Sequence, residues 1–239
     1  QINVINALLF RELTTKKSFS YLGFFGVIFE PLIVTGIYLI TLRLIRARID
    51  VGINPILFFG TGIILYSFFI STFTRSLSAI EANRNLFYYR QVKPIDTVIA
   101  RTLIEIMVIS IVYSLILAIV FYFNSRIILD NLPLLIGTFI LITILSFSVG
   151  VLALIIGYKF KWIRKFTPVF TRPIFFTSGS LFSVNLIPNE FKKYVLWNPL
   201  MHASELARYS LDNNYVLYKE ISLTYLMYVA FLIFSISIL

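Results

Sequence analysis

Uncharged apolar runs recur along the whole chain and are separated by short connections that are polar and mostly basic. A helix needs about 20 apolar residues to cross the hydrocarbon core of a bilayer, and a soluble domain of this length has no interior for so many such runs. The pattern predicts an all-α integral membrane protein with six transmembrane helices. We expect these helices at residues 21–42, 56–80, 98–123, 132–158, 166–187 and 221–239.

Two further segments are amphipathic and do not fit a crossing helix. In residues 2–18 the apolar side chains fall near one helical face, which predicts an interfacial helix; the alternative is the polar start of the first span. Residues 188–220 are irregular, and we expect a periplasmic or re-entrant segment with two short helices between Pro188 and Asn213. The preceding fifth run is broken by Pro168, Arg172, Pro173 and Gly179.

The connection at residues 83–96 holds more bulky side chains than a tether needs. Aromatic residues flanked by arginine are typical of docking surfaces, so we predict a short helix that docks into a partner protein. An aromatic belt beside lipid headgroups is the alternative. Pro94 and Asp96 then mark the start of the third membrane helix, because they suit a first helical turn. The docking residues are Asn85, Leu86, Phe87, Tyr88, Tyr89 and Arg90.

Glu30 and Arg172 lie well inside apolar runs. A charge there costs at least about 2.5–3.5 kcal/mol on insertion scales, so it normally faces a bundle interior or a water-filled path. We therefore predict that both residues belong to a translocation path. The alternatives are a structural ion pair for Glu30 and, for Arg172, a side chain that reaches back toward the Lys165 end of its run.

A short helix is predicted to begin at Asn198 and Pro199. Polar residues follow it at intervals of three, which places them along one side of that helix and suits a surface or a gate. The only histidine is among them, and in such a place it is more often a hydrogen-bonding group than a metal ligand. The predicted periplasmic gate consists of Trp197, His202, Glu205 and Arg208.

The composition supports the membrane assignment and argues against several other functions. Hydrophobic residues make up 59% of the chain and charged residues 13%, with a mean hydropathy of +0.88. The net charge of +10 lies at the ends of apolar runs, which fits anionic headgroups better than nucleic acid. Cysteine is absent and histidine occurs once, so neither disulfides nor a multi-histidine metal site is expected. The chain lacks a Walker-type phosphate loop and is not expected to hydrolyse ATP by that route.

The distribution of Lys and Arg predicts the orientation. With the amino terminus inside, these residues are more numerous on the inner side than on the outer side. We therefore expect both termini in the cytoplasm. The inner segments are 11–17, 84–101 and 159–165, and the outer ones are 43–48, 126 and 192–219.

The order of these features resembles the membrane subunit of type-2 ABC exporters and, within them, the capsular polysaccharide export permeases of Gram-negative bacteria. No single stretch is as specific as a nucleotide-binding loop, and the resemblance rests on their order and spacing. The matching stretches are residues 4–13 (VINALLFREL), Glu30-Pro31-Leu32, residues 85–90 with Val92 and Asp96, and Leu196-Trp197 with Pro199, Met201, His202, Glu205 and Arg208.

The resemblance implies a homodimer in the bacterial inner membrane that works with two separate ATP-binding subunits and exports a lipid-linked polysaccharide. ATP and Mg²⁺ would then bind the partner ATPase subunits, and no cofactor would bind this chain. The residues around 86–89 would form the coupling helix, and the segment after the fifth span would close the outer end. Besides membrane lipids, export proteins of the periplasm or outer membrane are further partners that such a subunit allows.

A carbohydrate path would need aromatic faces and hydroxyls. The first two spans offer aromatic residues for it, with lipid-facing positions as the alternative. Other functions also stay open: export of O-antigen, teichoic acid or another small molecule or lipid by the same fold, a membrane enzyme acting on lipid-linked sugar, and a passive channel. The aromatic candidates for the path are Tyr21, Phe25, Tyr38, Tyr66 and Phe69.

Overall fold

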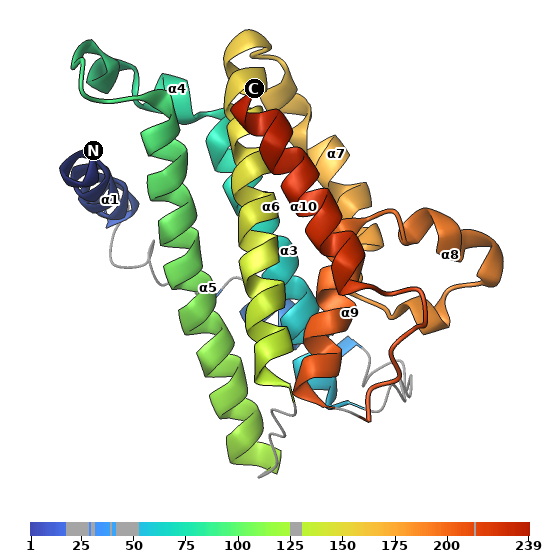
Figure 1. Ribbon diagram of the computed structural model, residues 1–239. Coiled ribbons are helices and arrows are strands. Elements are labelled where there is room, and N and C mark those ends of the chain that lie inside the picture. Colours follow the sequence, from blue (N-terminus) through green and yellow to red (C-terminus); the bar gives the residue numbers. More distant parts are fainter. Residues whose placement is uncertain (18–28, 30–31, 39, 42–52, 125–130, 213) are drawn as a thin grey trace.

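The computed structural model describes residues 1–17, 29, 32–38, 40–41, 53–124, 131–212 and 214–239. Within these residues the regular structure is entirely helical (Figure 1). The elements are α1 (Ile2–Lys17), α3 (Pro55–Leu77), α4 (Ala79–Ala82), η1 (Arg84–Tyr88), α5 (Pro94–Asn124), α6 (Leu132–Lys159), α7 (Ile163–Thr177), η2 (Val184–Leu186), α8 (Asn189–Val195), α9 (Pro199–Leu211) and α10 (Leu223–Ile238).

Among the described residues, three helices are long and apolar enough to cross a membrane: α3, α5 and α6. Each has proline in its first turn, where the missing N–H costs nothing. Asn54 and Asn131 cap α3 and α6 by accepting hydrogen bonds from backbone N–H groups. The predicted first span lies mostly outside the described residues, and α10 is a shorter apolar helix.

Helix α3 occupies the centre of the molecule and packs against α5, α6, α7 and α9. Glycines allow these helices to approach closely. A Cβ at Gly60 would lie 2.8 Å from Ile116, and one at Gly157 would collide with the backbone of Leu77. Such close approach is a common way for membrane helices to gain packing energy.

The elements near the predicted coupling connection gather at one end of the bundle (Figure 1). This end carries α4, η1, the start of α5 and the last residues of α10. Helix α1 lies beside the same end and packs against α5. The chain therefore returns to the coupling end after α9.

In the run at residues 166–187, where we expected breaks, α7 continues through Pro168 and Pro173 and the chain turns only after it. Helix α7 ends at Thr177, and Gly179 follows with a φ of 75°, a conformation that favours glycine. Beyond it, α8 stands away from the bundle, whereas α9 turns inward and packs against α3, α6 and α10 (Figure 1).

Candidate functional site

The predicted coupling residues lie on η1 and the turn after it, at the end of the bundle. Their aromatic side chains are largely exposed: Tyr88 by 81% and Tyr89 by 67%. Asn85 and Arg90 are also exposed, whereas Leu86 and Phe87 are half-buried. This combination of exposed aromatic and basic groups is suited to a partner that removes them from water.

Helix α1 holds both ends of this connection. Asn83 is buried, donates to the carbonyl of Ala79 over 2.9 Å and accepts a hydrogen bond of 2.6 Å from Arg11. At the other end, the buried carboxylate of Asp96 accepts the backbone N–H of Lys93 over 2.9 Å and the side-chain amide of Gln1 over 3.2 Å. These bonds fix where the connection leaves and rejoins the bundle.

A cluster of charges next to η1 joins α4 to the start of α7 and to the residues just before it. Glu81 accepts a hydrogen bond from Arg164 and lies 3.6 Å from the Lys161 ammonium. The bond from Arg164 lowers the pKa of Glu81 to about 2, so this carboxylate is ionised at neutral pH. An open groove of about 710 Å³ beside this cluster is also lined by Phe87 and Tyr88.

Two of the predicted path residues, Tyr38 and Tyr66, both contact the ring of Phe175, which the sequence did not indicate. Phe175 on α7 lies 4.9 Å from the ring of Tyr66 and 6.3 Å from that of Tyr38, measured between centroids. Tyr38 also stacks on Phe59 at 6.3 Å, and the Tyr66 hydroxyl donates to the carbonyl of Thr171 over 2.9 Å. Segments from three parts of the chain thus form one aromatic cluster.

Of the other predicted path residues, the structure describes Phe69 and Arg172. Phe69 is half-buried against the hydrophobic core, and Arg172 is exposed on α7. Tyr21, Phe25 and Glu30 lie outside the described residues.

Two ion pairs on α5 were not anticipated from the sequence. Arg75 on α3 lies 3.0 Å from Glu105, and Arg101 lies 2.8 Å from Glu12 on α1. Arg101 also donates to the backbone carbonyl of Arg75, which joins the two pairs. Arg101 and Glu105 are one helical turn apart inside an apolar run, so the reasoning that selected Glu30 would have selected Glu105 as well.

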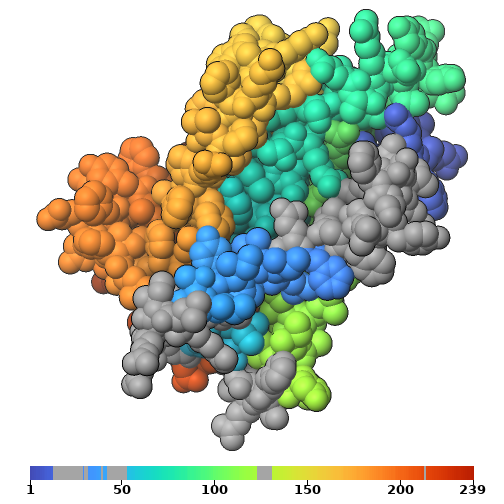
Figure 2. Space-filling model, turned by 180° about the vertical axis from the view of Figure 1, so that it is seen from behind, coloured from blue at the N-terminus to red at the C-terminus, as the bar shows by residue number. Residues whose placement is uncertain are grey.

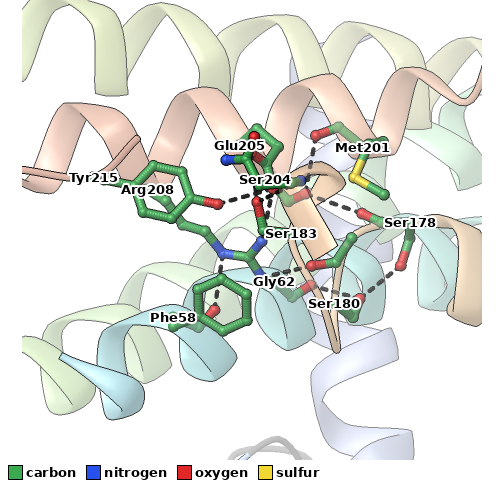
Figure 3. Close-up of polar contacts among 12 residues, drawn as sticks. Phe58, Gly62, Ser178, Ser180, Ser183, Met201, Ser204, Glu205, Arg208 and Tyr215 are labelled. Carbon is green, nitrogen blue, oxygen red and sulfur yellow. Dashed lines mark hydrogen bonds and ion pairs between the residues drawn. The ribbon is translucent and has the colours of Figure 1, made fainter. Parts of the chain in front are cut away.

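The polar residues of α9 are buried inside the protein. Glu205 and Arg208 have no exposed surface, and His202 is 2% exposed. The Arg208 guanidinium donates to the carbonyl of Phe58 over 3.1 Å and to that of Gly179 over 2.5 Å, and lies 3.6 Å from the Phe58 ring centroid (Figure 3). The expectation that these residues suit a surface is wrong, because α3 and the turn after α7 cover them.

Glu205 completes this cluster. It lies 3.3 Å from the Arg208 guanidinium and accepts hydrogen bonds from Tyr215 over 2.9 Å and Ser183 over 3.3 Å (Figure 3). Gly179 has no space for a side chain, because a Cβ there would collide with Ser204. The buried charges are thus paired and hydrogen-bonded, as burial requires.

His202 joins the start of α10 to the turn before α9. Its Nδ1 accepts the backbone N–H of Ser222 over 3.1 Å, so its Nε2 is the donor to the carbonyl of Leu196 at 2.9 Å. Trp197, the fourth predicted gate residue, is 80% exposed, and its carbonyl accepts a bond from Tyr225. Of the four predicted gate residues, three are therefore buried and Trp197 is exposed. We call the buried pair of Glu205 and Arg208, with the groups that hydrogen-bond to it, the buried clamp.

The described part of the chain is helical, with three helices long and apolar enough to cross a membrane, which is the architecture of a helical membrane protein. Its sequence matches the ABC-2 type transporter family over residues 3–211. The chain belongs to this family.

Individual relatives agree with this assignment. The chain is 36% identical to the polysialic acid transport protein KpsM of Escherichia coli, over 93% of this chain and 86% of KpsM. It is 29% identical to the capsule polysaccharide export inner-membrane protein BexB of Haemophilus influenzae, over 87% and 79% of the two chains. For the capsule polysaccharide export inner-membrane protein CtrC of Neisseria meningitidis serogroup B the identity is 26%, over 87% and 78%.

Proposed function

We propose that this chain is the permease subunit of an ATP-driven exporter that moves a lipid-linked capsular polysaccharide across the bacterial inner membrane. The observation that carries the proposal is the 36% identity to KpsM over 93% of the chain. The apolar helices α3, α5 and α6 supply the membrane-spanning scaffold that such a subunit needs.

Energy would come from two separate ATP-binding subunits, which hold ATP and Mg²⁺. We assign their docking site to η1 and the residues around it. Exposed Tyr88 and Tyr89 support this assignment, because aromatic groups flanked by arginine gain most when a partner covers them. Both termini would then lie in the cytoplasm, on the side of η1.

The path would run between two copies of the chain. On this copy it is lined by the cluster of Tyr38, Tyr66 and Phe175, together with the other residues selected from the sequence. The segment from Pro188 to Asn213 would close its outer end. Those other residues are Tyr21, Phe25, Glu30, Phe69 and Arg172.

The test is export in the cells that encode this chain. Deletion of its gene should remove surface polysaccharide and leave the polymer inside the cell, and the wild-type gene should restore it. The matched control restores the gene in cells whose partner ATPase carries an inactivating substitution, where no export should return. Surface polysaccharide that persists after deletion would contradict the proposal.

A further inference from the structure

A cavity of about 230 Å³ lies next to the aromatic cluster, between α3, α5, α7 and the segment around Val34. It is open on one side, and Figure 2 shows α3 at the surface between α7 (gold) and the described residues 32–41 (blue). Pockets that hold drug-sized ligands have about 300–1,000 Å³, so this one suits a smaller unit such as a single sugar ring.

One residue that lines the cavity, Glu105, is acidic, and a charge at such a position in a membrane helix costs free energy. Glu105 lies about 16 Å along α5 from Pro94, at 1.5 Å per residue, and only 4% of it is exposed. Its carboxylate lies 3.0 Å from the Arg75 guanidinium. An ionisable residue at such a depth marks a functional site by default.

The other polar groups of the cavity are available to a ligand. Ser67 and Ser71 line it one turn apart on α3, on the same side as Arg75. Within the described part of the chain, no hydrogen bond engages either hydroxyl. Tyr66 and Phe175 provide apolar ring faces beside them.

A second groove, between α5 and α6, has the apolar lining that a lipid-facing surface needs. Its volume is about 600 Å³. Its hydroxyls at Ser110, Ser114 and Thr143 all donate to carbonyls of their own helices, which leaves an apolar surface suited to acyl chains. The first cavity combines a carboxylate and two hydroxyls with aromatic rings, and an acyl chain would leave those polar groups unsatisfied.

We propose that this cavity is a subsite for one sugar ring of the exported polymer, and that Glu105, held by Arg75, binds its hydroxyls together with Ser67 and Ser71. A sugar ring has an apolar C–H face and a rim of hydroxyls. Tyr66 and Phe175 can pack against that face, the Glu105 carboxylate accepts from the hydroxyls, and the serine hydroxyls can donate to or accept from them. This subsite rests on the proposed export function.

The test uses cysteines in a chain that has none. Ser71→Cys or, if that variant fails to accumulate, Ser67→Cys is expressed with its ATPase partners in cells that make the polysaccharide and in cells that do not. Labelling by N-ethylmaleimide should be about threefold slower in the producing cells, the protection expected of a site filled about two-thirds of the time. Ser110→Cys, in the lipid-facing groove, is the matched control and should react equally in both.

Glu105→Gln in the Ser71→Cys background tests the role of the carboxylate. The difference between the two cell types should disappear, whereas a merely structural pair would leave the protection intact. In the Ser71→Cys protein that keeps Glu105, equal labelling in both cell types, or no labelling in either, contradicts the proposed subsite. If the wild-type chain exports polysaccharide in the same cells, only the subsite has failed; if it does not, the proposed function has failed.

Discussion

Arg208 donates more of the described side-chain hydrogen bonds than any other residue of α9. It is fully buried, and its guanidinium bonds to Phe58, Gly179 and Glu205 from three different elements. The fixed fork of the guanidinium can reach three acceptors at once, which a lysine ammonium does less well. Gly62 leaves room for it, because a Cβ there would lie 2.6 Å from the Arg208 Nη2.

Replacing Arg208 should therefore destabilise the protein strongly. Arg208→Met keeps much of the volume but leaves the Glu205 carboxylate buried without its cation, and loss of one partner of a buried pair costs about 3–5 kcal/mol. Arg172→Met, at an exposed arginine of α7, should change stability by no more than about 0.5 kcal/mol. Thermal unfolding of the purified protein in detergent, followed by tryptophan fluorescence, measures both. Equal midpoints for the two variants would contradict a clamp role for Arg208.

At the scale of elements, the connection between α3 and α5 is fixed at both ends by hydrogen bonds, and some of its aromatic side chains are exposed to solvent. Asn83 and Asp96 fix its two ends through α1, α4 and the start of α5. Between them, Tyr88 and Tyr89 face outward. A docking element needs both properties, since a mobile one would lose affinity to ordering on binding.

We expect the double variant Phe87→Ser and Tyr88→Ser to lose export while the protein still inserts into the membrane. The two rings supply apolar area that a partner would bury, and such anchors dominate binding energy. Tyr228→Ser is the matched control, because Tyr228 is 68% exposed on α10, away from this connection. Export and co-purification of the ATPase subunit are measured together. Normal values of both in the double variant would rule out docking at η1.

Local chemistry predicted some of these elements. Pro94 and Asp96 predicted a helix start that the structure has at Pro94, and Asn198 with Pro199 predicted the start of α9. Gly179 indicated a break near the end of α7, but the packing of that turn against α9 could not be predicted, because the residues it contacts are distant in sequence.

The same limit applies to the predicted gate. A spacing of three residues shows that His202, Glu205 and Arg208 share one side of a helix, but not what covers that side. Burial is decided by α3, α6, α10 and the turn after α7, which approach α9 from other parts of the chain. Phe175 was missed for the same reason, since nothing near it in sequence indicates its contact with Tyr38 and Tyr66.

At the scale of the whole molecule, α3 makes side-chain contacts with α5 near the coupling end and with the buried Arg208 of α9. Arg75, near its end, pairs with α5 beside α4, and Phe58, near its start, accepts Arg208 of α9. A helix of 23 residues is about 35 Å long and is stiff over that length. Movement of α3 at the coupling end would therefore act directly on the contacts of α9.

If α9 closes the outer end, a residue buried under it should become reachable only during export. Met201 has no exposed surface and packs against Gly179, so Met201→Cys should resist a membrane-impermeant maleimide added from the periplasm while the partner ATPase is inactive. It should react when the ATPase is active, because opening must separate α9 from the turn after α7. Trp197→Cys, at a position 80% exposed, should react in both states and serves as the control. Equal reaction of Met201→Cys in both states would contradict the gate, and reaction only from the cytoplasmic side would reverse the orientation.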